Sequence, residues 1–453
     1  MGWQYTLAEL AQVVDAKAPS ADVSFSAVSK DTRSLKSGDV YFALKGEQFD
    51  GERFVSDAFA AGASAAVCAS SNDDGPCVVV PDALVALQQF AAHHRNRFEI
   101  PIVAITGSCG KTTAKDFTSA VLATRNTVAK TEGNLNNEIG CPLSILNIDN
   151  ETDIAVIEMG ANHAGEIRSL CAWARPTESA ITIIAPAHLE GFGTIENVAQ
   201  AKSEIAQLLP VEGVFYVNND DLRCRAIGDQ IDCEKITFGD AGQVAIRSYR
   251  RRDDGEVDLD IDPIGTIRIP LACRAHATNV LLAIAVGLRH GIEQFEAPLR
   301  EALQHATRFT IREVGPLRII DDTYNANPAS MKAALEALNE QLGNGARYAA
   351  LGDMLELGKD AAAYHTEIGE YAARLGTKGL FALGQHANDI VQGARGIGIA
   401  SAQGFPDTKT IAHAIAETVA PCDIILIKGS RGLRMENVIA ELERIYNVER
   451  GDG

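Results

Sequence analysis

The sequence predicts an α/β protein made of three domains. Its 453 residues are too many for one ordinary core, and about 150 residues per domain is a common size. Short, nearly continuous apolar runs such as Ile102–Ile105 and Ile154–Ile157 each precede polar residues and a helical segment. Runs of this kind, separated by helices, are typical of a parallel sheet covered on both faces. The same rhythm starts afresh near residue 313, which indicates a further α/β domain.

The composition argues against several classes of function. The chain is 46% hydrophobic and 22% charged, as expected of a globular protein with ample core material. A formal net charge of -19 argues against a general affinity for nucleic acid or for an anionic membrane surface. The nine cysteines include no C-x-x-C pair, which favours incidental thiols over a disulfide framework or a zinc site.

The chain carries no recognisable targeting segment. Its first residues, MGWQYTLAELAQVVDAK, lack a basic region followed by an apolar one. No apolar run approaches the roughly 20 residues that span a bilayer. We therefore expect a cytoplasmic protein without a membrane partner, and a monomer is the working expectation.

Residues 1–82 are predicted to form a small N-terminal α/β domain. In chain order, we expect a helix over Leu7–Val14, a strand over Val40–Leu44, an alanine-rich helix over Val55–Ala66 that feeds a strand at Ala65–Cys68, and a strand over Val78–Val80. Asp82 is placed to cap the helix that follows.

Residues 83–312 are predicted to form a central domain of P-loop type with a mostly parallel sheet, and residues 313–453 a Rossmann-like α/β domain. The central strands are expected at Ile102–Ile105, Ile154–Ile157 and Ala180–Ile184, and the helices at Ala114–Ala123, Ile195–Leu209 and Ala277–His290. Residues 251–268 alternate like antiparallel strands. In the last domain we expect strands at Leu317–Ile320, Arg347–Leu351 and Ile424–Ile427 and a helix at Ser330–Gln341.

A glycine-rich loop, TGSCGKTT at Thr106–Thr113, lies between a predicted strand and a predicted helix. In this arrangement backbone N–H groups cradle phosphates at the N-terminus of a helix. Gly107 and Gly110 would let phosphate oxygens approach the backbone closely. Lys111 would supply a cation for the β- and γ-phosphates, and the Thr112 hydroxyl would bind Mg²⁺. An ordinary turn is the alternative.

Polar side chains follow the predicted strands, at the edge where open α/β sheets bind ligands. Glu158 follows Ile154–Ile157 and would hold Mg²⁺ directly or through water, or would cap the next turn. His188 and Lys202, taken alone, are better explained by a structural histidine and a surface lysine. The Asx-rich turn at 321–327 and the basic segment at 428–432 fit either ligand binding or ordinary turns.

Eight segments together resemble the Mur ligase family, in order and in spacing, over essentially the whole chain. They are TGSCGKTT (106–113), EGNLNNEIG (132–140), IEMGANHAGEI (157–167), HLEGFGTIENVAQAKSEI (188–205), HATN (276–279), DDTYNANPASM (321–331), LGDMLELG (351–358) and KGSRG (428–432). The shortened T-G-x-x-G-K-T loop is the family's own form, so Ile105 in place of a first glycine fits it. Residues 31–51 resemble the segment that holds the uridine end of the substrate.

Within the family, GANHAGEI, YNANP and LGDMLELG resemble the branch that adds D-alanyl-D-alanine to UDP-N-acetylmuramoyl-tripeptide. The D-N-P-R motif of the branch that adds the third amino acid does not occur in the sequence. The resemblance implies that the tripeptide carboxylate attacks the γ-phosphate of ATP, giving an acyl phosphate from which the dipeptide amine then displaces phosphate. The third residue of the tripeptide is either meso-diaminopimelate or lysine.

The resemblance also implies roles by matching position. The catalytic set would be Lys111, Lys202, His188, Glu158 and Arg308. ATP would contact Thr106, Gly107, Ser108, Cys109, Gly110, Lys111, Thr112, Thr113, His276, Asn279, Arg308, Asp322, Tyr324 and Asn325. Two Mg²⁺ ions would be held by Thr112, Glu158, His188 and Lys202, with Lys202 as a CO₂-derived carbamate that offers Mg²⁺ anionic oxygen. Substrate would contact Asp31, Thr32, Arg33, Lys45, Gly46, Asn134, Asn137, Lys428 and Arg431.

Two residues depart from the family pattern. Thr307 precedes Arg308 where glycine is common, which would stiffen the linker, and Gly432 replaces a more usual serine. Two alternatives stay open at this point. A folylpolyglutamate synthase-like ligase would share the loop and the carbamate lysine, and an ATP-driven switch would use neither peptide substrate.

Overall fold

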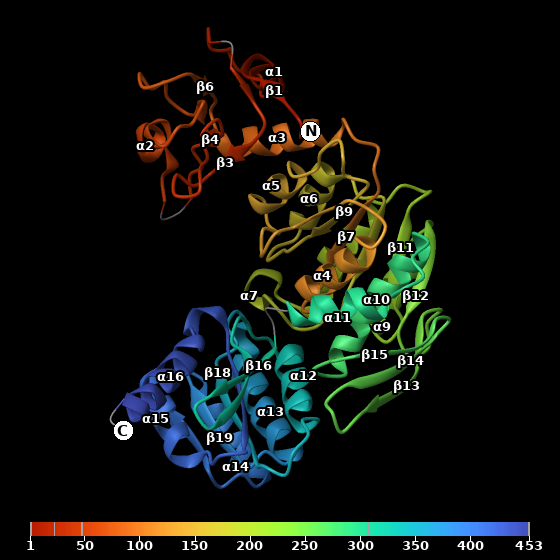
Figure 1. Ribbon diagram of the computed structural model, residues 1–453, viewed down its shortest axis with the longest axis vertical. Coiled ribbons are helices and arrows are strands. Elements are labelled where there is room, and N and C mark those ends of the chain that lie inside the picture. The colour runs from red at the N-terminus through yellow and green to blue at the C-terminus, as the bar shows by residue number, and fades with distance from the viewer. Residues whose placement is uncertain (1, 22, 47–48, 306–308, 452–453) are drawn as a thin grey trace.

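The protein forms three α/β units that follow one another along its long axis, as the computed structural model shows (Figure 1). The structure describes residues 2–21, 23–46, 49–305 and 309–451, with side chains as far as residue 447. The predicted fold class is therefore confirmed. Among these residues, none of the helices combines the length and the apolar character that a bilayer crossing requires.

The N-terminal unit is built on a four-stranded parallel sheet in the order β3-β4-β5-β6. Its elements are β1 (Tyr5–Thr6), α1 (Leu7–Val13), β2 (Ser24–Phe25), β3 (Val28–Ser29), β4 (Val40–Phe42), the 3-10 helix η1 (Gly51–Phe54), α2 (Val55–Ala60), β5 (Ala65–Cys68) and β6 (Cys77–Val79). The helix expected over Val55–Ala66 is wrong in its second half. It ends at Ala60 because Gly62, at φ +102°, turns the chain into β5.

Helix α3 (Ala83–Arg95) joins this unit to the central one. It begins where predicted, because the Asp82 carboxylate accepts from the backbone N–H groups of Leu84 and Val85 at 2.7 and 3.2 Å. It packs on α1 and also on two central helices, α5 and α6. The indole of Trp3 donates to the Leu146 carbonyl at 2.6 Å, so the first residues are also anchored on the central unit.

The central sheet has six parallel strands in the order β12-β11-β10-β7-β9-β8. Their bounds are β7 (Ile102–Thr106), β8 (Val128–Lys130), β9 (Ile154–Glu158), β10 (Glu178–Ile181), β11 (Val214–Asn218) and β12 (Glu234–Phe238). The helices are α4 (Lys111–Leu122), α5 (Gly140–Ile145), α6 (Glu166–Ala174), α7 (Leu189–Phe192), α8 (Ile195–Gln207), α9 (Leu222–Gly228), α10 (Ala275–Arg289) and α11 (Glu296–Gln304). Strand β7 lies at the middle, between two strands that come later in the chain, which is a switch point where such sheets bind ligands.

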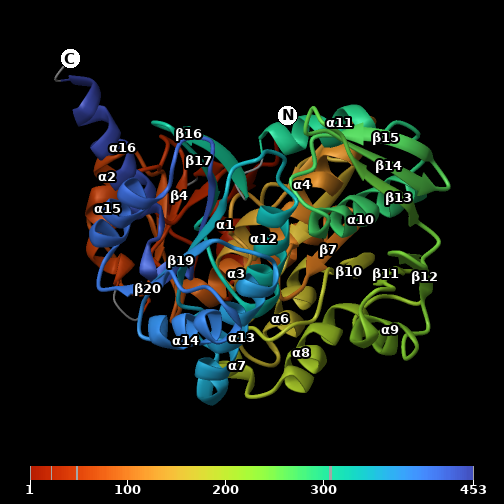
Figure 2. The same ribbon diagram turned by 90° about the horizontal axis from the view of Figure 1, so that it is seen from below.

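Both faces of this sheet are buried, as the continuous apolar strands predict. Ile102 and Ala104 of β7 face a core shared with α5, α6, α8 and the N-terminal unit. Val103 and Ile105 face a second core with α4 and α10. The predicted antiparallel segment is confirmed as β13 (Ala245–Arg251), β14 (Val257–Asp262) and β15 (Gly265–Ile269), which lies on the opposite side of the molecule from α15 and α16 (Figure 2).

The C-terminal unit has a six-stranded sheet in the order β16-β17-β21-β18-β19-β20, parallel except for β16. Its strands are β16 (Thr310–Val314), β17 (Leu317–Asp322), β18 (Arg347–Gly352), β19 (Gly379–Leu383), β20 (Ala402–Phe405) and β21 (Ile424–Lys428). Its helices are α12 (Pro328–Asn339), η2 (Gly358–Asp360), α13 (Ala361–Arg374), α14 (Ala387–Ile397), α15 (Thr408–Thr418), η3 (Arg431–Leu433) and α16 (Glu436–Gly451). Strand β16 begins before the predicted boundary at residue 313.

Candidate active site

The glycine loop runs from the end of β7 into the first turn of α4. Helix α4 begins at Lys111, three residues earlier than predicted, because Gly110 takes a left-handed conformation at φ +81° and turns the chain into the helix. No side chain caps this helix start. The first N–H groups of α4 are therefore left without a side-chain acceptor, at the positive end of the helix dipole, which suits an anion such as phosphate.

The loop is fixed by the segment that follows β10. The backbone N–H of Ser108 donates to Ile183, and its hydroxyl donates to the Ala185 carbonyl at 2.8 Å. The Thr182 hydroxyl donates to the Cys109 carbonyl at 2.5 Å. These contacts explain why β10 ends at Ile181, whereas a strand was expected to continue to Ile184. Ser108 thus has a structural role in shaping the loop.

The reason for glycine at position 107 differs from the prediction. A Cβ built on Gly107 would lie 1.9 Å from the Thr182 hydroxyl oxygen, so the residue is needed for close packing inside the protein. A Cβ on Gly110 would lie 3.0 Å from the side-chain oxygen of Asn279, on α10. At Gly107 a Cβ would therefore collide with the protein itself, whereas at Gly110 it would make only a tight contact with the Asn279 side chain.

The ammonium group of Lys111 lies over the loop and donates to the Gly107 carbonyl at 2.8 Å. Among the described residues it has no carboxylate within ion-pair distance. Its charge is therefore available to neutralise a bound anion, as the sequence predicts.

Glu158 ends β9, the strand beside β7, and its side chain is buried. Its Oε1 accepts from the Asn136 amide at 2.6 Å, and its backbone N–H donates to the Thr131 hydroxyl at 3.0 Å. Its Oε2 is buried with no hydrogen-bond partner among the described residues. Such an oxygen is costly unless a cation or water satisfies it. The prediction missed Asn136, because nothing in EGNLNNEIG distinguishes it from Asn134 and Asn137.

Lys202 of α8 is only 1% exposed, so it is not the surface lysine that it resembles in isolation. Burial, together with the nearby charge of Lys111, lowers the pKa of Lys202 to about 7. No described carboxylate forms an ion pair with it. The sequence offered no signal for this environment beyond the family resemblance.

His188 lies between β10 and α7 with a left-handed backbone at φ +52°. Its Nδ1 forms a hydrogen bond with a carboxylate oxygen of Glu356, which belongs to the C-terminal unit. Burial lowers the pKa of His188, while Glu356 opposes that shift. The nearby charges of Lys111 and Lys202 add to the lowering, which places all three side chains in one neighbourhood. Glu356 was not predicted, although it lies within the quoted LGDMLELG segment.

The turn after β17 is held to the end of β21 by Lys428. Its ammonium group donates to Asp322 at 2.5 Å and to the Asn325 carbonyl at 2.8 Å, and the residue is buried. Lys428 also lines the cleft, and its contact with substrate stays a prediction. Arg431 lies over the Tyr324 ring and donates to Glu436 at 2.8 Å. It does not line the cleft.

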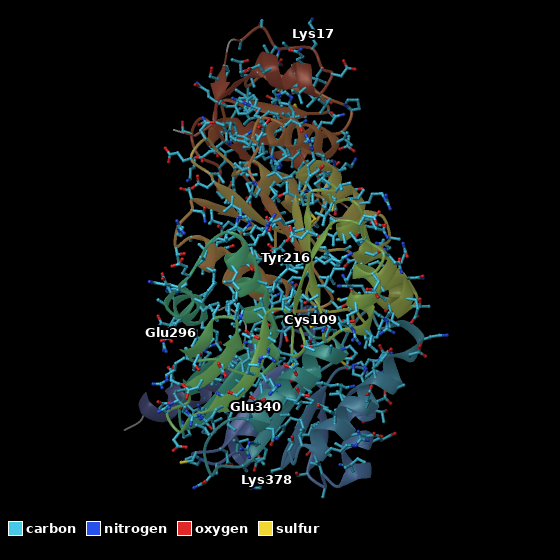
Figure 3. The ribbon with its side chains drawn as sticks, turned by 90° about the vertical axis from the view of Figure 1, so that its right-hand side faces the viewer. Lys17, Cys109, Tyr216, Glu296, Glu340 and Lys378 are labelled. Atoms are coloured by element: carbon cyan, nitrogen blue, oxygen red, sulfur yellow. The ribbon has the colours of Figure 1, made fainter. Side chains whose placement is uncertain are left out.

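A cleft of about 570 Å³ separates the central unit from the C-terminal unit. Both units line it. The predicted site residues on its walls are Ser108, Cys109, Gly110, Lys111, Thr112, Thr113, Asn134, Asn137, Glu158, His188, His276, Asn279, Asp322, Tyr324, Asn325 and Lys428. In Figure 3 the labelled Cys109 lies at the level where the two units meet. The amide of Asn327, at the start of α12, donates to the Ser108 carbonyl at 3.0 Å across this junction.

His276 connects the cleft to a second cavity. It lines both, together with Thr113 and Phe309, and the second cavity has a volume of about 510 Å³. The His276 ring packs edge-on against Phe309, and its Nδ1 is buried without a partner among the described residues. Burial lowers the pKa of His276. A neutral ring with an unsatisfied nitrogen is suited to a polar ligand such as a nucleobase.

Other predicted residues lie elsewhere. Asp31, Thr32, Arg33, Lys45 and Gly46 belong to the N-terminal unit and do not line this cleft. The Arg33 guanidinium donates to Asp31 and holds the pKa of that carboxyl well below its usual range. Thr307 and Arg308 lie outside the described residues. The cleft is also lined by Asn162, His163 and Glu166, from the GANHAGEI segment, which had been assigned no role.

An uncapped glycine loop, a buried acid on the neighbouring strand and an α/β unit facing both define the class of ATP-using enzymes with a P-loop-type domain. Three family descriptions match the chain: "Mur ligase family, catalytic domain" at residues 24–95, "Mur ligase middle domain" at 105–287 and "Mur ligase, glutamate ligase domain" at 307–431. The chain belongs to the Mur ligase family.

Individual relatives match over nearly the full length. The UDP-N-acetylmuramoyl-tripeptide--D-alanyl-D-alanine ligase of Escherichia coli is 34% identical, with 97% of this chain and 98% of the relative covered. A crystal structure of MurF from Acinetobacter baumannii superposes with a TM-score of 0.86 at 30% identity, covering 98% of this chain and 99% of the other. The MurF ligase from Thermotoga maritima, solved in complex with ADP, superposes at 0.81 with 27% identity, covering 93% and 98%.

Proposed function

We propose that this chain is an ATP-dependent ligase that joins D-alanyl-D-alanine to UDP-N-acetylmuramoyl-tripeptide, giving the pentapeptide precursor of peptidoglycan, ADP and phosphate. The observation that carries the proposal is the cleft in which the glycine loop faces Asp322 and Asn325 of the C-terminal unit. The names of full-length relatives supply the substrates. The sibling folylpolyglutamate synthase superposes at only 16% identity, which supports the shared fold alone.

The reaction requires two anions to approach each other, since a peptide carboxylate attacks the γ-phosphate of ATP. The uncapped N-terminus of α4 and the Lys111 ammonium would hold the phosphates and reduce their negative charge. In the acyl phosphate that results, the carbonyl carbon is open to the dipeptide amine, and phosphate leaves. The cavity beside His276 and Phe309 would receive the nucleoside end of ATP.

The residues present fit Mg²⁺. Glu158 offers a buried carboxylate oxygen without a partner, and Thr112 lines the same cleft with its hydroxyl. When bound, Mg²⁺ would neutralise phosphate charge and align the oxygens for in-line transfer. Among the described residues no three His, Cys, Asp or Glu side chains gather at one point. A second ion would be held by His188 and by the carbamate that Lys202 could become.

We propose that Lys202 reacts with CO₂ to form a carbamate beside His188. Its nitrogen attacks the CO₂ carbon and loses a proton, which requires the neutral amine. A pKa of about 7 makes much of this amine neutral near pH 7, whereas an ordinary lysine is almost wholly protonated. We expect Lys202→Ala to lose ligase activity, and added short carboxylic acids to restore part of it. Full activity in the variant would refute the carbamate role.

The arrangement of domains suits protection of the acyl phosphate. The C-terminal unit contacts the loop through Asn327, and closure of this kind excludes water that would hydrolyse the intermediate. We propose that residues 1–82 bind the uridine end of the substrate through the segment 31–51. Residues 83–312 would be the ATP domain and residues 313–453 the ligase domain. The Arg308 guanidinium would reach the phosphates. We propose further that the enzyme acts as a cytoplasmic monomer.

One assay tests the function. Phosphate release should be measured with ATP, UDP-N-acetylmuramoyl-tripeptide and D-alanyl-D-alanine, and with each omitted in turn. We expect release at full rate only when all three are present. Strong release with ATP alone would exclude the ligase and favour an ATP-driven switch, and release that depends on a folate would favour the related synthase.

A further inference from the structure

The His188–Glu356 pair joins two domains at the edge of the cleft. His188 belongs to the central unit and Glu356 to the loop between β18 and η2 of the C-terminal unit. A second bond runs between the same segments, from the Glu190 backbone N–H to the Glu356 carbonyl at 3.2 Å. The contact therefore involves both the side chain and the backbone of Glu356.

The two halves of this pair are held in place separately. The His188 carbonyl accepts from the N–H groups of Gly191 and Phe192 at 3.0 Å, which fixes its backbone. Among the described residues, Glu356 provides the one hydrogen bond to the His188 ring. The central unit thus holds the histidine backbone, and the hydrogen bond to its imidazole comes from the C-terminal unit.

The C-terminal unit, in contrast, holds the Glu356 loop firmly. The Asp353 carboxylate accepts from the N–H groups of Gln385 and His386 at 2.6 and 3.0 Å. The N–H of Leu355 donates to the buried Ser430 hydroxyl at 2.9 Å. Glu356 itself has a left-handed backbone at φ +63°, which turns it toward the central unit. Its carboxylate is therefore presented by a loop that the C-terminal core has already shaped.

The bond determines which ring nitrogen is available. A carboxylate only accepts, so Nδ1 carries the hydrogen, and in the neutral ring Nε2 keeps its lone pair. Histidine ligands of metals are commonly oriented in this way by a carboxylate on the other nitrogen. His188 also lines the cleft, so an Nε2 lone pair is available there to bind a metal ion.

We propose that Glu356 is a positioning residue that fixes the ring and tautomer of His188 and does so only when the C-terminal domain is docked on the central domain. Domain closure then completes the metal side of the ATP site. This inference rests on the proposed function, in which His188 serves that site. Glu356 itself does not line the cleft.

Two variants of Glu356 and one control test the proposal. Glu356→Ala removes the acceptor, and Glu356→Gln keeps the shape while removing the charge. The matched control is Glu340→Gln, at a different contact between the same two domains (Glu340 is labelled in Figure 3). There the Glu340 carboxylate accepts from the Tyr249 hydroxyl at 3.0 Å and from the Arg251 guanidinium at 3.2 Å. Glu340 lines neither the cleft nor the cavity beside His276.

The first measurement is kinetic. We expect Glu356→Ala to lower kcat roughly 10- to 100-fold and to raise the Mg²⁺ concentration needed for half activity, the usual range for loss of such a partner. The affinity for a non-hydrolysable ATP analogue, measured without metal, should stay unchanged. Glu340→Gln should change kcat by less than about threefold. Equal losses in both variants would mean that Glu356 only helps the domains to dock, and would overturn the proposal.

The second measurement does not depend on turnover. Long-range ¹H–¹⁵N NMR spectra of ¹⁵N-histidine-labelled protein report the tautomer of each ring, and His188→Gln identifies its signal. We expect a single tautomer of His188 with hydrogen on Nδ1 in the wild type and in Glu340→Gln, and a mixture in Glu356→Ala. A wild-type spectrum in Glu356→Ala would refute the inference. If the wild type itself forms no amide, the proposed function fails instead.

Discussion

The buried Lys202 gives a prediction that separates stability from activity. Replacing it with methionine keeps a long, flexible side chain and removes a group whose charged form is costly to bury. The pKa of Lys202 falls from 10.5 to about 7 on folding. At about 1.4 kcal/mol per pKa unit, the protonated lysine destabilises the folded state by about 5 kcal/mol. We therefore expect Lys202→Met to be more stable than the wild type and to have no ligase activity.

The stability difference between Lys202→Met and the wild type should decrease as the pH rises. Between pH 7 and 10.5 the unfolded chain binds more protons than the folded one, so the stability of the wild type rises across that window. The advantage of Lys202→Met should be full below pH 7, fall to about 2 kcal/mol at pH 9, and vanish above the unfolded pKa. Carbamylation is least in CO₂-free buffer at about pH 6.5, which is where the comparison is cleanest.

Calorimetry in CO₂-free buffer checks this. For a domain of this size, about 5 kcal/mol corresponds to a rise in Tm of about 10–20 °C. The matched control is Lys409→Met, an exposed lysine on α15, for which we expect a change within about 0.5 kcal/mol. A Tm of Lys202→Met that equals or falls below that of the wild type at pH 6.5 would refute the reasoning, as would a difference that does not shrink as the pH rises.

Three further substitutions test the site. Lys111→Ala should lower phosphate release by at least about 100-fold, because one charge that acts on the transferred phosphoryl group is lost. Binding of the UDP-substrate, measured by calorimetry, should persist. Unchanged turnover would contradict the loop assignment. Gly107→Ala should weaken ATP binding roughly tenfold or more, because the added Cβ would lie 1.9 Å from the Thr182 hydroxyl oxygen. Adding Thr182→Ala to this variant should partly restore ATP binding, and titration with a fluorescent ATP analogue measures both effects. Glu158→Gln should raise the Mg²⁺ concentration required for activity, because a neutral amide replaces the carboxylate with the unpartnered oxygen. An unchanged Mg²⁺ titration would count against the metal role.

Local patterns in the sequence predicted much of the fold. Asp82 started α3 where its capping side chain indicated, and the apolar run at Ile154–Ile157 became a strand buried on both faces. One error arose where distant residues set the end of a strand. The chain leaves β10 at Ile181 because the next residues bond to the glycine loop, and those partners lie about 75 positions away.

The candidate site was predicted less evenly. The loop residues around Lys111 line the cleft as expected. Lys428 also lines the cleft, but the sequence did not indicate that its ammonium group pairs with Asp322, 106 positions away. Asn136 and Glu356 were both inside quoted segments, but sequence order does not say which amide or acid will face Glu158 or His188.

The sequence by itself determined the α/β class, the phosphate-binding loop and the family, because these follow from short-range periodicity, from glycine and lysine at fixed spacing, and from the order of motifs. Only the tertiary structure decided that Lys202 is buried, that it forms no ion pair with an acid in the described part of the chain, and that Glu356 of the C-terminal domain is the one described hydrogen-bond partner of the His188 ring. The burial and pKa of Lys202 and the ring orientation of His188 are set by side chains from distant parts of the chain, and local sequence patterns do not predict those contacts.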